Sequence, residues 1–201
     1  MNVNSNNYKQ YTFFALILIG ISTFIAYIIF IAIGPQFSKL PAIIQIVISI
    51  PTVPAIYAGI FFVFDKYLWK YKFFKSIGIL LADDLNGTWK GIARSSWDDF
   101  KGEIPVEFVI NQTATSIKVC GKFNQSRSVS IHEYFGKNDM HNQTALYYFY
   151  KNDPNYDAPA TMAMHEGSTI LIYDKDTKIL SGYYYSGRDR HNHGTISVAR
   201  V

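Results

Sequence analysis

The 201-residue sequence predicts an all-β antiparallel barrel of about eight strands, preceded by an N-terminal two-helix transmembrane hairpin. Two observations predict this fold class. Two uncharged apolar runs open the chain, and short stretches with a period of two fill the rest of it. We therefore assign residues 1–76 to the hairpin and a basic linker, and residues 77–201 to a cytosolic barrel domain.

The apolar runs cover about residues 11–34 and 42–64. Each reaches the roughly 20 residues that a helix needs to cross hydrocarbon, and neither contains Asp, Glu, Lys or Arg. A signal peptide is the alternative for the first run. That run exceeds the roughly 7–15 apolar residues of a signal core, and a second run follows at once, so we favour two membrane spans.

Proline and lysine positions refine the hairpin. Gly34-Pro35 begins the predicted turn, and Pro51 and Pro54 should kink the second helix. The turn carries Lys39, whereas the segment after the second run carries four lysines: Lys66, Lys70, Lys72 and Lys75. The positive-inside rule then places both termini in the cytoplasm.

Charge is unevenly distributed along the chain. Before Leu85, six lysines face three aspartates, while from Leu85 onward thirteen Lys and Arg face twelve Asp and Glu. Basic residues at a membrane edge suit anionic lipid headgroups. The nearly neutral remainder lacks the broad basic face of a protein that binds DNA or RNA duplexes.

Strand-like segments rich in Val, Ile, Thr, Tyr and Phe occupy the chain from Leu85 onward, with turn residues between them. The predicted segments are Thr88–Trp97, Val106–Asn111, Ser116–Phe123, Ser128–Phe135, Ala145–Tyr150, Ala160–His165, Thr169–Tyr173, Ile179–Ser186 and Thr195–Val201. Eight or nine strands at this spacing indicate an antiparallel barrel or sandwich. We favour a barrel, because eight strands leave an interior wide enough for one small ligand.

The first and last predicted strands indicate which residues line that interior. In the first, alternation places Trp89, Gly91, Ala93, Ser95 and Trp97 on one face, which we expect to point inward. In the last, Thr195, Ser197 and Ala199 form a similarly small and mildly polar face. Small inward residues on neighbouring strands predict a cavity. The alternative is a narrow barrel taper packed tightly with small residues.

Two short motifs carry family resemblances. Gly87-Thr88-Trp89 resembles the opening strand of lipocalins and fatty-acid-binding proteins, in which a Gly-x-Trp seals the barrel floor. The whole layout, with the Leu85-Asn-Gly-Thr-Trp-Lys-Gly start and the Gly182-Tyr-Tyr-Tyr-Ser-Gly-Arg and His193-Gly-Thr-Ile-Ser-Val-Ala-Arg segments, looks like a second family. That family is the two-transmembrane β-barrel effectors of bacterial cyclic-oligonucleotide antiphage systems (CBASS).

The CBASS resemblance implies a function. Such an effector would bind a cyclic di- or trinucleotide made by a partner nucleotidyltransferase, self-associate and disrupt the bacterial inner membrane. It would be a multi-pass protein of that membrane, with both termini and the barrel in the cytoplasm. The cyclic oligonucleotide would be its activating ligand, and no further cofactor is expected.

A pocket for such a ligand needs aromatic faces for bases and Arg or backbone N–H groups for phosphates. The candidate ligand-binding residues are Trp89, Ser95, Tyr148, Tyr150, Tyr183, Tyr185, Arg188, Thr195 and Ser197. Alternation lets only half of each tyrosine run face inward, and we favour Tyr183 and Tyr185 because Gly182 on the other face indicates close packing outside. Arg188 and Arg190 would bind phosphate, with solvated turn charges as the alternative.

Enzymatic signals are weak. Two histidines one residue apart in a turn, as His191 and His193 are, are more often solvated than metal-bound, and the chain contains no nucleophile elbow, glycine-rich phosphate loop or paired-cysteine motif. We expect no catalysis and no bound metal. Two alternative functions remain: a membrane-tethered barrel that carries or senses a lipid or other apolar ligand, and a structural subunit with a filled barrel that docks a partner protein.

Overall fold

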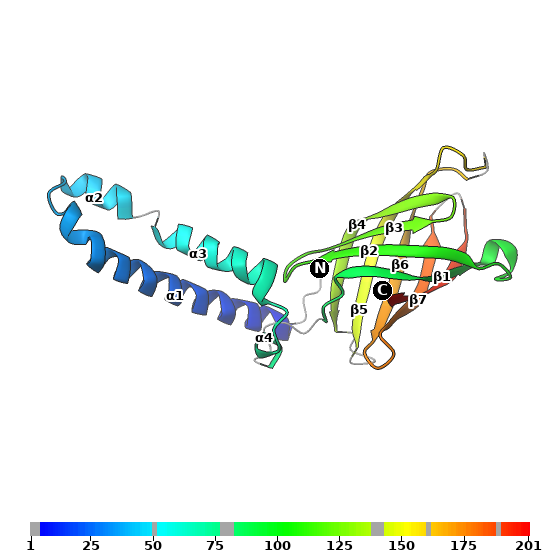
Figure 1. The fold of residues 1–201 in the computed structure, drawn as a ribbon, viewed down its shortest axis with the longest axis horizontal. Coiled ribbons are helices and arrows are strands. Elements are labelled where there is room, and N and C mark those ends of the chain that lie inside the picture. Colours follow the sequence, from blue (N-terminus) through cyan, green and yellow to red (C-terminus); the bar gives the residue numbers. More distant parts are fainter. Residues whose placement is uncertain (1–4, 50–51, 77–82, 138–142, 160–161, 188–189) are drawn as a thin grey trace. The chain divides into compact units, whose positions relative to one another are not determined.

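The computed structural model describes residues 5–49, 52–76, 83–137, 143–159, 162–187 and 190–201. The chain forms two compact units, Met1–Leu80 and Leu81–Val201. Helices make up the first unit and strands the second (Figure 1).

The helical unit is built around two adjacent helices. Its elements are α1 (Ser5–Phe37), α2 (Ala42–Ser49), α3 (Thr52–Val63), a π-helical turn η1 (Phe64–Leu68) and α4 (Lys72–Ser76). Helices α1 and α3 lie side by side (Figure 1), and the rings of Phe14 and Phe64 meet with centroids 4.4 Å apart. The predicted helical hairpin is therefore present.

The turn predicted at Gly34-Pro35 and Lys39-Leu40-Pro41 begins later than expected, and only its second part is a turn. Helix α1 continues through Gly34 and Pro35 to Phe37, because a proline in the last turn removes only one backbone donor. The Ser38 N–H donates to the Gly34 carbonyl at 3.0 Å, and the chain reverses over the following residues. Pro51 lies outside the described residues, and Pro54 lies in the first turn of α3, where proline is tolerated.

Membrane-crossing capacity differs between the two runs. Within the described part of the chain, one helical segment, Thr12–Ala32, is long and apolar enough to cross a bilayer. This supports membrane association. Helices α2 and α3 span 8 and 12 residues, each short of the roughly 20 that one crossing requires. A second crossing therefore stays a prediction.

The strands form a closed barrel in which each strand is antiparallel to the next and β8 pairs with β1. The strands are β1 (Gly87–Ser95), β2 (Ile104–Gln112), β3 (Ile117–Phe123), β4 (Ser126–Lys137), β5 (Thr144–Pro154), β6 (His165–Asp174), β7 (Ile179–Ser186) and β8 (His193–Arg200). The barrel prediction is confirmed. The separate strand predicted at Ala160–His165 is wrong: residues 162–164 are irregular, residues 160–161 lie outside the described part, and His165 begins β6.

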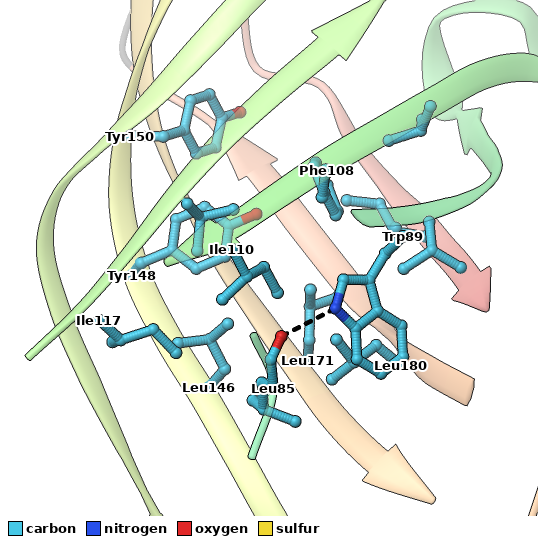
Figure 2. Packing of buried hydrophobic residues seen from close by; sticks show 14 of the residues in the cluster. Leu85, Trp89, Phe108, Ile110, Ile117, Leu146, Tyr148, Tyr150, Leu171 and Leu180 are labelled. Atoms are coloured by element: carbon cyan, nitrogen blue, oxygen red, sulfur yellow. Dashed lines mark hydrogen bonds between the residues drawn. The ribbon is translucent and has the colours of Figure 1, made fainter. Parts of the chain in front are cut away.

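One end of the barrel is filled with side chains; we call it the packed end, formed around Leu85, Trp89, Leu171 and Leu180 (Figure 2). Trp89 is fully buried, and its indole N–H donates to the Leu85 carbonyl at 2.9 Å. The Arg200 guanidinium lies 4.9 Å from the Trp89 ring centroid on the indole face. The tryptophan thus seals the barrel floor, as the lipocalin-like motif predicts.

The chain enters the barrel at this packed end and is held there by side chains of other strands. The Leu85 N–H donates to Gln112 Oε1 at 2.7 Å, and Thr144 Oγ1 donates to Asp83 Oδ2 at 2.8 Å. Lys175 Nζ lies 3.1 Å from the same Asp83 oxygen. These contacts tie the segment before β1 to β2, β5 and the β6–β7 turn. All of them lie at the packed end of the barrel.

Candidate ligand pocket at the barrel mouth

A pocket of about 320 Å³ occupies the end of the barrel opposite the packed end. Its walls come from the last residues of β1, β3, β5 and β7 and the first residues of β4, β6 and β8. Polar side chains dominate one part of the wall: Ser95, Tyr148, Tyr150, Thr169, Tyr184 and Ser186. The alternative of a narrow barrel taper packed tightly with small residues is therefore wrong at this end of the barrel.

Three tyrosines place their phenol groups in this pocket. Tyr148 and Tyr150 point inward from β5 (Figure 2), and Tyr184 lines the pocket from β7. The Tyr148 side chain lies near that of Thr169 and the Tyr184 side chain near that of Ser95, and the Tyr150 hydroxyl donates to the Tyr185 carbonyl at 3.3 Å. These hydroxyls form a polar layer above the apolar packed end.

Burial keeps the three phenols neutral. It raises the pKa of Tyr150 to about 12 and raises the pKa of both Tyr148 and Tyr184 above the ordinary value. A neutral phenol can donate a hydrogen bond to a phosphate oxygen or accept one from a base. The tyrosines therefore offer both aromatic faces and donors to a ligand.

Arg190 and His165 add a guanidinium and an imidazole to the pocket wall. Arg190 Nη1 lies 3.4 Å from His165 Nδ1, and Nδ1 also lies 3.1 Å from the Ala163 carbonyl oxygen. Nδ1 cannot both accept from Arg190 and donate to Ala163, and a guanidinium in this wall is a suitable partner for a ligand anion. Burial, with a further contribution from Arg190, lowers the pKa of His165, so this ring favours its neutral form.

Several predicted site residues do line the pocket. Ser95, Tyr148 and Tyr150 line it, as the sequence analysis expects, and so does Arg190. Arg188 falls outside the described residues. Trp89 points inward as predicted, but it belongs to the packed end and is absent from the pocket wall, so its predicted ligand contact is wrong.

The predicted inward face is wrong for both β7 and β8. On β8 the buried residues are Gly194, Ile196 and Val198, while Thr195 and Ser197 are exposed outside. Tyr183 and Tyr185 are 44% and 51% exposed on the outer surface, and Tyr184 takes the inner position opposite Gly194. A shift of one residue exchanges the faces of a whole strand.

The error has an identifiable physical source. Gly182 lies on the inner face with Leu180 and Tyr184, where a Cβ atom would come within 1.9 Å of the Ile170 carbonyl oxygen on β6. The glycine therefore marks close packing between neighbouring strand backbones and not close packing outside the barrel. Sequence reasoning consequently missed Tyr184, and it also missed Asp98, His165, Thr169 and Ser186.

Comparison with known proteins identifies the barrel. The family model described as "Cap15, cyclic dinucleotide receptor domain" matches residues 82–200, which contain every strand. The chain belongs to the Cap15 cyclic dinucleotide receptor family. It is also 27% identical over 158 residues to CD-NTase-associated protein 15 from Yersinia aleksiciae, covering 77% of this chain and 72% of that relative. The resemblance to CBASS effectors is thereby confirmed.

Membership of the Cap15 family assigns the barrel to a receptor class without assigning the contacting residues. Among the described residues, no group of three or more His, Cys, Asp or Glu side chains could hold a metal ion. The described lining residues offer aromatic rings, neutral hydroxyls, side-chain amides, one imidazole, one guanidinium and one carboxylate.

Proposed function

We propose that this chain binds a cyclic dinucleotide in the mouth pocket of its barrel and acts without catalysis on the bacterial inner membrane through its N-terminal helices. The observation that carries the proposal is the coincidence of the Cap15 receptor match, residues 82–200, with a barrel whose mouth holds an aromatic, hydroxyl-rich pocket. The apolar segment Thr12–Ala32 supports the membrane location.

The pocket chemistry supports a nucleotide over a lipid. Tyr148, Tyr150 and Tyr184 present aromatic faces and neutral hydroxyls, and Arg190 supplies a guanidinium for a phosphate. A lipid carrier would need a mainly aliphatic lining, whereas the aliphatic side chains here fill the packed end. The lipid-binding alternative is therefore the weaker proposal.

The pocket volume favours the smaller cyclic ligand. About 320 Å³ lies at the low end of the roughly 300–1,000 Å³ range of small-molecule pockets. A cyclic dinucleotide fits this volume better than a trinucleotide, and part of it would remain at the open mouth. There it would lie next to Trp97 and Asn192, which line the rim.

Self-association and membrane disruption complete the proposal. Exposed rings on the outer surface near the mouth form a patch: Tyr183 and Tyr185 centroids are 5.8 Å apart, and His193 lies 6.4 Å from Tyr185 and 5.6 Å from Phe100. Exposed aromatic patches often mark protein interfaces, which supports a contact between copies after ligand binding. The name of the Yersinia relative supports a partner nucleotidyltransferase as the source of the ligand.

Neighbouring tyrosines of β7 provide a matched test of this pocket. In the purified full-length chain, Tyr184→Ala removes an inner ring and should weaken cyclic dinucleotide binding by at least about fivefold, because stacking on one base is worth about 1–3 kcal/mol. Tyr185→Ala removes an outer ring and should leave the affinity unchanged at protein concentrations low enough to keep the copies apart. Ligand-dependent rise of the melting temperature measures both, since binding stabilises the folded state by mass action.

Two results would contradict the proposal. A panel of cyclic dinucleotides that produces no shift, while fatty acids do, would favour the lipid alternative. Chromatography of the ligand recovered after binding tests for turnover. Conversion of the nucleotide to a product would contradict a non-catalytic receptor.

A further inference from the structure

The connection between β1 and β2 lines the pocket and contains two features that destabilise the folded chain, a strained backbone and an unpartnered carboxylate oxygen among the described residues. Its short 3₁₀ turn η2 (Ser96–Asp98) places Trp97 and Asp98 in the pocket wall. The next two residues, Asp99 and Phe100, have φ values of 55° and 62°, a left-handed conformation that non-glycine residues rarely adopt. Strained backbone conformations of this kind cluster at ligand-binding sites, which is consistent with a role for this connection in binding the ligand.

Asp98 has a carboxylate oxygen that lacks a partner. Its Oδ2 accepts a hydrogen bond from the Gly102 N–H at 2.8 Å, which fixes the orientation of the carboxyl group. Its Oδ1 is buried and has no hydrogen-bond partner among the described residues. Because a buried unsatisfied acceptor destabilises the protein, the free oxygen is costly in the absence of a ligand donor.

The negative charge of Asp98 limits which part of the ligand can lie against it. A carboxylate in the wall of a pocket for an anionic ligand repels that ligand unless the two share a hydrogen bond. Phosphate oxygens carry no donor, so the donor must come from a base or a ribose hydroxyl. Trp97, adjacent to Asp98 and 75% exposed, presents an aromatic face in the same wall. A planar base can stack on the indole while its edge reaches the carboxylate.

We infer that Trp97 and Asp98 read one nucleobase of the ligand and select a base with a ring N–H. This inference rests on the proposed function and names its base specificity. Guanine and uracil carry a ring N–H that Asp98 Oδ1 can accept. Adenine and cytosine offer an exocyclic amine, but it lies beside a ring lone pair that the carboxylate repels, so we expect them to bind less tightly than a base with a ring N–H. Since Oδ1 is closed to solvent in the free protein and Gly102 holds the carboxyl group, the exposed Trp97 indole turns aside as the base enters.

The test measures affinities of the full-length chain in detergent for cyclic di-GMP, cyclic di-UMP and cyclic di-AMP. The wild type should bind at least one of the first two about tenfold or more tighter than cyclic di-AMP, as expected for a hydrogen bond to a charged group. Asp98→Asn keeps an oxygen for Gly102 but turns an amide donor toward the pocket, so the preference should fall below about threefold or reverse. Asp99→Asn is the control, because it neutralises the exposed carboxylate of the adjacent residue. It should preserve the base preference.

Tryptophan fluorescence supplies a second readout. Trp69 and Trp89 are fully buried, so a change in emission on ligand binding reports the exposed Trp97 and should vanish in Trp97→Phe. An unchanged preference in Asp98→Asn, or a wild type that binds cyclic di-AMP as tightly as the other two, overturns this inference and leaves the proposed function standing. If none of the three ligands binds the wild type, the proposed function itself fails.

Discussion

At the scale of single residues, the surroundings of His165 in the pocket wall lower the pKa of its imidazole. The ring lies 6.2 Å from that of Tyr150 and next to the Arg190 guanidinium, and it is half-buried. Burial disfavours the imidazolium, and the neighbouring positive charge disfavours it further. The folded chain therefore holds His165 neutral to lower pH than the unfolded chain does.

A stability prediction follows from the sign of this pKa shift. With the folded pKa below the ordinary 6.5, the contribution of His165 to stability is present above pH 6.5 and is lost as the pH falls through the folded value. Between pH 7 and pH 5, thermal unfolding should shift to lower temperature in the wild type and by less in His165→Gln. His132→Gln, an exposed change on β4, is the control and should behave as the wild type does. An identical pH dependence in the wild type and His165→Gln would contradict this account.

The tyrosines illustrate what residue type alone can predict. The sequence shows three consecutive tyrosines, Tyr183 to Tyr185, and any of them could stack on a base. Which one faces inward depends on the register between β7 and β8, where Tyr184 pairs with Gly194 and gains room for its ring. Residue chemistry was therefore predictable, and the direction of each side chain was not.

At the scale of elements, the closure of the barrel depends on the contact between β1 and β8. A Cβ atom on Gly91 would come within 2.0 Å of the Ser197 carbonyl oxygen, so the two backbones approach too closely for a side chain. Strand periods and turn residues located most strands within a few residues. They could not show this approach, because it joins segments about a hundred residues apart.

Gly91→Ala should accordingly destabilise the barrel by about 1–3 kcal/mol or more, because overpacking forces the strands apart. Lys90→Ala, a change of the exposed neighbouring residue on the same strand, should alter the free energy of unfolding by about 0.5 kcal/mol or less. Chemical denaturation of both variants measures the difference. A Gly91→Ala variant as stable as the wild type would show that β1 and β8 can separate without loss.

At the scale of the whole molecule, the lysines after residue 64 predict the topology. The turn carries only Lys39, and four lysines outweigh it, so both termini should lie in the cytoplasm: Lys66, Lys70, Lys72 and Lys75. A reporter active only in the periplasm, fused after Val201, should be inactive, and a cytoplasm-active reporter at the same position should work. Activity of the periplasmic reporter would reverse the orientation and place the pocket away from a cytoplasmic ligand.

The sequence by itself determined the order of parts: apolar helices, a basic segment, then an antiparallel barrel. Those features follow from local periods, charge and turn chemistry, which act over short stretches of chain. Only the tertiary structure decided which faces of β7 and β8 point inward, how Tyr184, His165 and Arg190 meet at the mouth, and that Asp98 keeps a free oxygen there. These depend on strand register and barrel closure, which join residues far apart in the chain and exchange a strand's faces with a shift of one residue.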